Sequence, residues 1–121
     1  MITFEEFVKK HSDEIDKIKL FTCRPISDEA PIMDEELCTA NGYFGRLSYL
    51  LPLAEYYLDI AEKDKLPIKS KDYTDYDREI TLRCLCANER LFRDIIRGQL
   101  EACDKRISSI QSKVKGFMKG V

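Results

Sequence analysis

The sequence predicts an all-α protein: a single domain over residues 1–121, built as a helical hairpin with one long C-terminal helix that carries a heptad seam. Three observations predict this class. Charged residues make up 35% of the chain and hydrophobic residues 44%, a balance typical of long amphipathic helices. Glycine (5) and proline (4) are scarce, so helices are seldom interrupted. Apolar residues recur at steps of three and four along most of the chain.

The first helix is expected over residues 1–20. Thr3 followed by Glu6 fits a capping box at its start. The apolar residues of this segment fall on one helical stripe, and His11, the single histidine, lies on that stripe. His11 is therefore expected in the core rather than in a catalytic site. The run CRPISDEAPIMD that follows contains two prolines and predicts a loop.

The second helical element is expected over residues 33–65, which are rich in leucine and tyrosine. Pro52 lies inside it and removes one backbone hydrogen bond, which kinks or restarts a helix. We therefore expect two pieces, about 33–50 and 52–65, that are collinear or bent. Residues 65–73, KLPIKSKDY, are expected to form a connector.

The third helix is expected to run without a break over residues 75–117, which would make it about 60 Å long. Thr74 is a suitable N-cap, and Asp75 and Asp77 in the first turn favour the helix dipole. Gly98 is the only glycine in the interior of this helix, and the segment has no proline.

Apolar residues in the second half of this helix alternate at steps of four and three, which is a heptad seam. Such a seam needs a partner, either the second element folded back or another copy of the chain. Isoleucine at both core positions favours assemblies larger than two chains, so we expect a homo-oligomer, with a compact monomeric bundle as the alternative. The expected interface residues are Ile96, Leu100, Ile107, Ile110 and Val114.

Charge is unevenly distributed along the chain. Residues 1–77 carry 10 basic and 17 acidic side chains, a net charge of −7, and residues 78–121 carry 10 basic and 5 acidic, a net charge of +5. The basic part could attract a polyanion, or the two parts could complement each other within or between chains. If the basic helix face follows a phosphate backbone rather than facing only solvent, the expected contact residues are Arg90, Arg93, Arg97, Arg106 and Lys113.

No motif for catalysis or metal binding is present in the sequence. The five cysteines include no CxxC pair, and a single histidine is available, so neither a zinc site nor a histidine-based triad is expected. Phosphate-binding loops, HExxH and nucleophile elbows are absent. We expect no enzymatic activity and no cofactor. No apolar run approaches the length of a membrane span, so we expect a protein of the cytoplasm.

The layout resembles that of a known family. A Leu/Tyr-rich helix, YFGRLSYLLPLAEYYLDIAEK, is followed by a polar linker and a long helix with LFRDIIRGQLEACDKRISSIQS. Over about residues 33–118 this resembles the UvsY-type recombination mediators of tailed phages. The best matched positions are Arg93, Lys105, Arg106, Ile107, Ile110 and Gln111.

The resemblance implies a ring-like helical homo-oligomer that binds single-stranded DNA in the host cytoplasm. It also implies that the protein helps to load a recombinase onto strands coated by a single-strand-binding protein, without enzymatic activity or a cofactor. Two alternatives come from the residues themselves. One is a helical structural or assembly protein, such as a virion component or scaffold, that binds no nucleic acid. The other is a small acidic inhibitor of a host nucleic-acid-binding protein.

Overall fold

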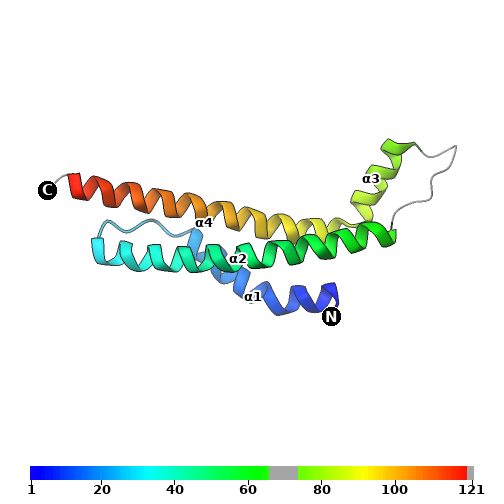
Figure 1. The fold of residues 1–121 in the computed structure, drawn as a ribbon, viewed down its shortest axis with the longest axis horizontal. Helices are drawn as coiled ribbons and strands as arrows, with labels where there is room; N and C mark the ends of the chain where they lie inside the picture. The colour runs from blue at the N-terminus through cyan, green and yellow to red at the C-terminus, as the bar shows by residue number, and fades with distance from the viewer. Residues whose placement is uncertain (66–73, 120–121) are drawn as a thin grey trace.

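The chain folds into a long helical hairpin with a further helix packed along its side. The computed structural model describes residues 1–65 and 74–119, and within these residues every regular element is a helix, as the sequence predicted. α2 and α4 lie side by side and antiparallel, and α1 packs beside them near the middle of the hairpin (Figure 1). The helices are α1 (Phe4–Thr22), α2 (Ala30–Lys65), α3 (Asp75–Leu85) and α4 (Ala87–Lys119).

α1 begins where its capping residue predicted. The backbone N–H of Glu6 donates to the side-chain oxygen of Thr3 at 3.2 Å, and Glu5 and Glu6 in the first turn favour the helix dipole. The helix continues two residues past the expected end at 20. His11 is buried on the apolar stripe, as predicted, with its ring 4.9 Å from that of Phe7.

α2 is one continuous helix from Ala30 to Lys65, so the predicted division into two pieces at Pro52 is wrong. Pro52 lies on the exposed face, where the carbonyl of Ser48 that loses its N–H partner can be hydrated. Leu50 and Ala54 on the opposite face are buried, and their packing keeps the helix continuous at Pro52.

The long helix predicted over 75–117 is divided at Cys86 into α3 and α4, which is a second correction. Cys86 has a non-helical backbone with φ −107° and ψ 23°, and its side chain is fully buried against Leu58 and Ala61 near the end of α2. Lys65, the last residue of α2, donates to the carbonyl of Leu85 at 3.1 Å. A straight continuation would carry the helix past the end of α2, and α3 instead turns away from the hairpin (Figure 1).

α3 is capped at its start, and Leu82 packs against the cluster of Leu58, Ala61 and Cys86. Thr74 and Asp77 form a reciprocal capping box, with the N–H of Asp77 donating to the Thr74 hydroxyl at 3.1 Å. None of its side chains is buried. Apart from Lys65, the connector expected over 65–73 lies outside the described residues.

The core is formed where the three longest helices meet. Phe7 and Ile18 of α1, Leu47 of α2 and Ile96 of α4 belong to one buried cluster. The hydroxyl of Tyr57 donates to the carbonyl of Ile2 at 2.7 Å, so the start of α1 is also attached to α2. Within the described residues, no helix combines the length and apolar character needed to cross a bilayer.

An ion pair between α1 and α2 makes stability depend on pH. Arg46 donates to Glu14 at 2.5 Å. Burial alone would raise the pKa of Glu14, but the hydrogen bonds and charges of Arg46 and His11 together outweigh it, so the pKa lies below its ordinary value of 4.5. Because the pKa is lowered on folding, this stabilisation is complete above the ordinary value and is lost as pH falls through the folded-state pKa.

We therefore predict that Glu14→Gln lowers the free energy of unfolding at neutral pH and that its difference from the wild type shrinks below pH 4.5. Urea unfolding at a series of pH values measures this. Asp13→Asn, an exposed position on the same helix, is the matched control and should change little at any pH. A difference for Glu14→Gln that grows at acid pH would contradict the prediction.

Candidate interface residues of α4

The predicted seam of α4 faces the chain's own helices. Ile96 and Ile110 are fully buried within the chain, and Ile96 packs in the cluster that contains Leu47 and Leu50 of α2. The other three expected interface residues, Leu100, Ile107 and Val114, are half-buried. The chain therefore supplies the partner for much of this seam, and a heptad contact between separate copies stays a prediction.

Arg90 and Arg97 form ion pairs with glutamates of α2. Arg90 donates to Glu62 at 2.8 Å, and Arg97 lies 3.6 Å from Glu55. The two arginines and the two glutamates are each seven residues apart. In an antiparallel pair of helices, equal spacings keep both pairs in register, so one face of α4 matches one face of α2 in charge.

Arg93 and Lys113 also have acidic partners. Arg93 donates to its neighbour Asp94 at 2.9 Å, rather than to Glu89 four residues earlier. Lys113 donates to Asp28 in the loop between α1 and α2 at 2.6 Å. The hydrogen bond and charge of Lys113 hold the pKa of the Asp28 carboxyl below its ordinary value.

Arg106 is the most enclosed of the five expected nucleic-acid contacts, with only 6% of its surface exposed. Its guanidinium donates to the carbonyl of Arg24 at 2.6 Å and lies 3.4 Å from the carboxylate of Glu36. Its central carbon lies 4.6 Å from the ring centre of Phe21. In this conformation Arg106 joins the end of α1, the following loop and α2, and it has no free face for a phosphate.

The acidic partners of Arg90 and Arg97 lie on another helix, so the spacing of charges within α4 does not identify them. Within α3, Glu79 and Arg83 are four residues apart and form a contact at 2.7 Å. Glu89 instead lies 3.7 Å from Lys65. The sequence shows that Arg90 and Arg97 are seven residues apart, as are Glu55 and Glu62. The two sets can be matched as ion pairs only when the alignment of α4 against α2 is known.

The cysteines divide into two groups. Cys86 and Cys103 are buried, as expected of small apolar side chains, and burial raises the pKa of both thiols. A raised pKa keeps a thiol protonated and unreactive. Cys23, Cys38 and Cys84 are exposed.

A groove between α1 and the start of α4 is a feature that sequence reasoning did not find. Its volume is about 490 Å³. Its apolar residues include Val8 and Ile15 of α1 and Leu91 and Ile95 of α4. Leu91 is 61% exposed, so the groove is open to solvent. We name this the α1/α4 groove; its polar rim residues are Glu5, Ser12, Asp16 and Asn88.

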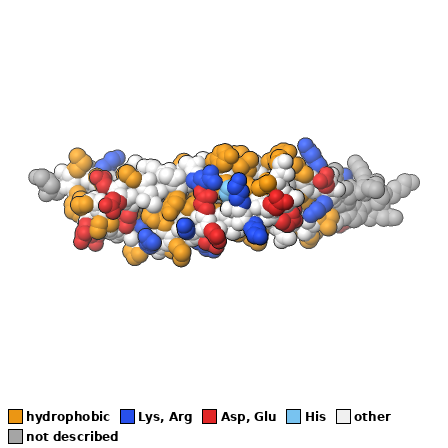
Figure 2. Space-filling model, turned by 90° about the horizontal axis from the view of Figure 1, so that it is seen from below, with side chains coloured by type: hydrophobic (Ala, Val, Ile, Leu, Met, Phe, Trp, Pro, Cys, Tyr) orange, Lys and Arg blue, Asp and Glu red, His pale blue; other side chains and the backbone are white. Residues whose placement is uncertain are grey.

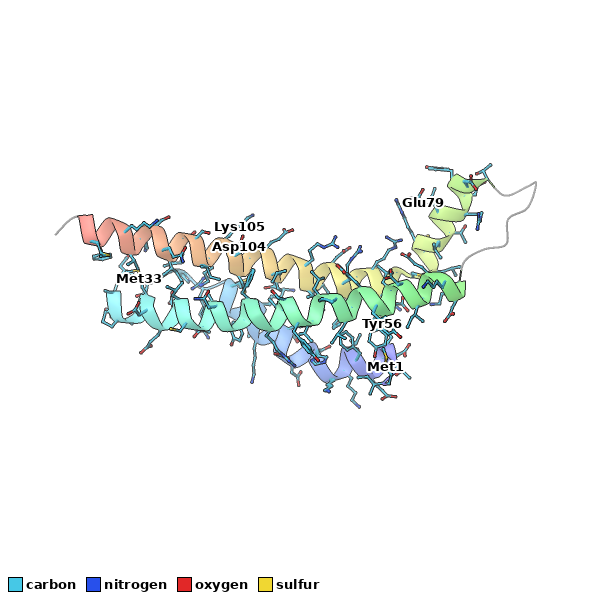
Figure 3. The ribbon with its side chains drawn as sticks, in the orientation of Figure 1. Met1, Met33, Tyr56, Glu79, Asp104 and Lys105 are labelled. Atoms are coloured by element: carbon cyan, nitrogen blue, oxygen red, sulfur yellow. The ribbon has the colours of Figure 1, made fainter. Side chains whose placement is uncertain are left out.

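The surface around α1 carries charges of both signs. Figure 2 shows a group of hydrophobic side chains along the upper edge of this view and acidic and basic side chains interspersed across its middle, so the described residues in view form no continuous basic band. On α4, Asp104 and Lys105 are neighbours on the side turned away from α2 (Figure 3). Met33, near the start of α2, is fully buried and lies on the side of α2 that faces α4 (Figure 3).

No protein-family model, curated protein or solved structure matches the chain. Functional inference therefore rests on the contacts and surfaces described above.

Proposed function

We propose that this chain is a non-enzymatic helical assembly protein, which acts by binding protein surfaces through its helices. One observation carries the proposal: all five cations expected to contact nucleic acid already have acidic partners within the chain. The partners are Glu62 for Arg90, Asp94 for Arg93, Glu55 for Arg97, Glu36 for Arg106 and Asp28 for Lys113.

This pairing accounts for the uneven charge of the sequence. The net charge of +5 over residues 78–121 lies against part of the net charge of −7 over residues 1–77. A phosphate backbone would have to displace several carboxylates to reach these cations, which reduces the gain from counterion release. The same pairing uses acidic groups that an inhibitor mimicking nucleic acid would need, so it also gives no support to that alternative.

We expect the wild-type chain to bind a labelled single-stranded oligonucleotide only weakly at 50 mM salt, with almost no dependence of affinity on salt. Fluorescence anisotropy over a salt series measures this. The matched variant Glu55→Gln/Glu62→Gln releases Arg97 and Arg90 and should gain salt-dependent binding. Tight wild-type binding that weakens steeply with salt would refute the assembly-only proposal.

Single-stranded DNA binding, as in the recombination mediators that the sequence resembles, is the second candidate. The observation that favours it is the state of Arg97, whose side chain is 46% exposed and lies a long 3.6 Å from Glu55. An exposed pair of this kind contributes little to stability and can be exchanged for a phosphate. Loading of a recombinase onto protein-coated strands belongs to this same proposal.

Arg97→Gln tests the second candidate in the same assay. If Arg97 contacts a phosphate, this variant should weaken binding and reduce the salt slope by about one. Arg83→Gln, at a cation on α3 that is also exposed and paired with a glutamate, is the control and should leave the slope unchanged. Equal binding by Arg97→Gln and the wild type would remove Arg97 from any DNA interface.

A further inference from the structure

We propose that the α1/α4 groove binds the C-terminal end of α4 from a second copy of the chain. This inference rests on the proposed assembly function and names the contact that would perform it. It differs from the heptad seam, because the seam residues face α2 of the same chain whereas the groove is open.

The groove offers an apolar floor with an acidic edge. Val8 and Ile15 line it from α1, and Leu91 and Ile95 line it from α4. The charged groups among its lining residues are Glu5 and Asp16, both acidic and both exposed. A groove of this kind suits one face of an amphipathic helix whose apolar side chains are flanked by basic ones.

The end of α4 has that character. Phe117 is 50% exposed and Met118 is 74% exposed, so two large apolar side chains at this end of the helix are open to solvent. Lys115 lies beside them and is exposed. The end of α4 extends beyond the start of α2 (Figure 1), so the hairpin does not cover these residues.

Distance indicates that the occupant is a second copy. Phe117 lies 25 positions after Phe92, which is about 38 Å along a helix, so the end of α4 cannot reach the groove of its own chain. Two copies related by a two-fold axis, with their α4 helices antiparallel, could place each end in the other's groove. Such a contact is closed and self-complementary, so it would give a dimer rather than a filament.

Charge supports the pairing as well. The exposed Lys115 would approach the rim carboxylate Asp16, and neither Asp16 nor Glu5 has an ion pair with another described residue. Burial of Phe117 and Leu91 would supply most of the affinity, because apolar groups at the centre of a contact dominate its binding energy. The charges would set the direction in which the helix end enters.

The test is the mass of the full-length chain in solution, measured by sedimentation at several concentrations. We expect a dimer, and we expect Leu91→Glu and Phe117→Glu each to raise its dissociation constant at least about tenfold. Both positions are half-exposed or more, so circular dichroism should show an unchanged fold. Leu20→Glu, at a 69% exposed position of α1 outside the groove, is the control and should leave the dimer intact.

A charge exchange adds a second readout. Asp16→Lys and Lys115→Glu should each weaken the dimer, and the two together should restore part of the loss, which identifies a direct contact. A chain that is monomeric at all concentrations would overturn the proposal, as would a dimer insensitive to Leu91→Glu and Phe117→Glu. A dimer broken only by Ile107→Asp would overturn the groove contact and leave the assembly function standing, with the heptad seam as its interface.

Discussion

Replacing Arg106 with methionine should lower the free energy of unfolding by about 3 kcal/mol. Methionine keeps an unbranched apolar stem over Phe21 but removes every donor. The carbonyl of Arg24 then loses its 2.6 Å hydrogen bond, and the largely buried carboxylate of Glu36 loses its cation. Urea unfolding followed by circular dichroism measures the change.

The neighbouring residue gives a matched control for that experiment. Lys105 is exposed, so Lys105→Met should change the free energy of unfolding by less than about 0.5 kcal/mol. Double replacement of Arg106 and Glu36 by methionine should cost less than the sum of the two single changes, because no unpaired charge is left. If Arg106→Met and Lys105→Met have equal effects, the guanidinium does not join α1 to α2 as described.

Ile18→Ala should lower the free energy of unfolding by about 3 kcal/mol. Ile18 is fully buried and belongs to the cluster shared by α1, α2 and α4, so the truncation leaves a cavity between three helices. The loss measures how much of the chain's stability comes from the attachment of α1 to the hairpin. Chemical denaturation of the full-length protein gives the value.

Leu20 provides the comparison on the same helix. Its side chain is 69% exposed, and Leu20→Ala should cost less than about 0.5 kcal/mol. A small effect at both positions would mean that α1 is not docked in solution. The hairpin of α2 and α4 would then have to be stable by itself.

The helices were predictable where packing and local signals agree. Thr3 and the apolar stripe of α1 predicted both its start and its buried face. At Pro52 the local signal was overridden, since burial of Leu50 and Ala54 outweighs one missing hydrogen bond on an exposed face. The break at Cys86 could not be predicted, because it depends on where α2 ends, and the sequence around Cys86 contains no glycine or proline to announce it.

The charged residues of the candidate interface were predictable from the sequence, but their partners were not. The spacing of the arginines on α4 predicted a basic face, but the charges opposite these arginines depend on the register of the hairpin. Arg106 shows the difference most clearly, since three of its partners come from the end of α1, the loop and α2, between 70 and 85 positions away in the chain. The α1/α4 groove likewise exists only once α1 is placed beside α4.

The turn at Cys86 has a consequence for how this protein loses its structure. α3 has eleven residues, too few for a helix to persist alone in water, and it buries no side chain. Its capping box and the bond from Lys65 to Leu85 can break while the cluster around Ile96 stays intact. The amide hydrogens of α3 would therefore exchange with solvent through local opening, far more readily than those of the hairpin, which open only with the whole molecule.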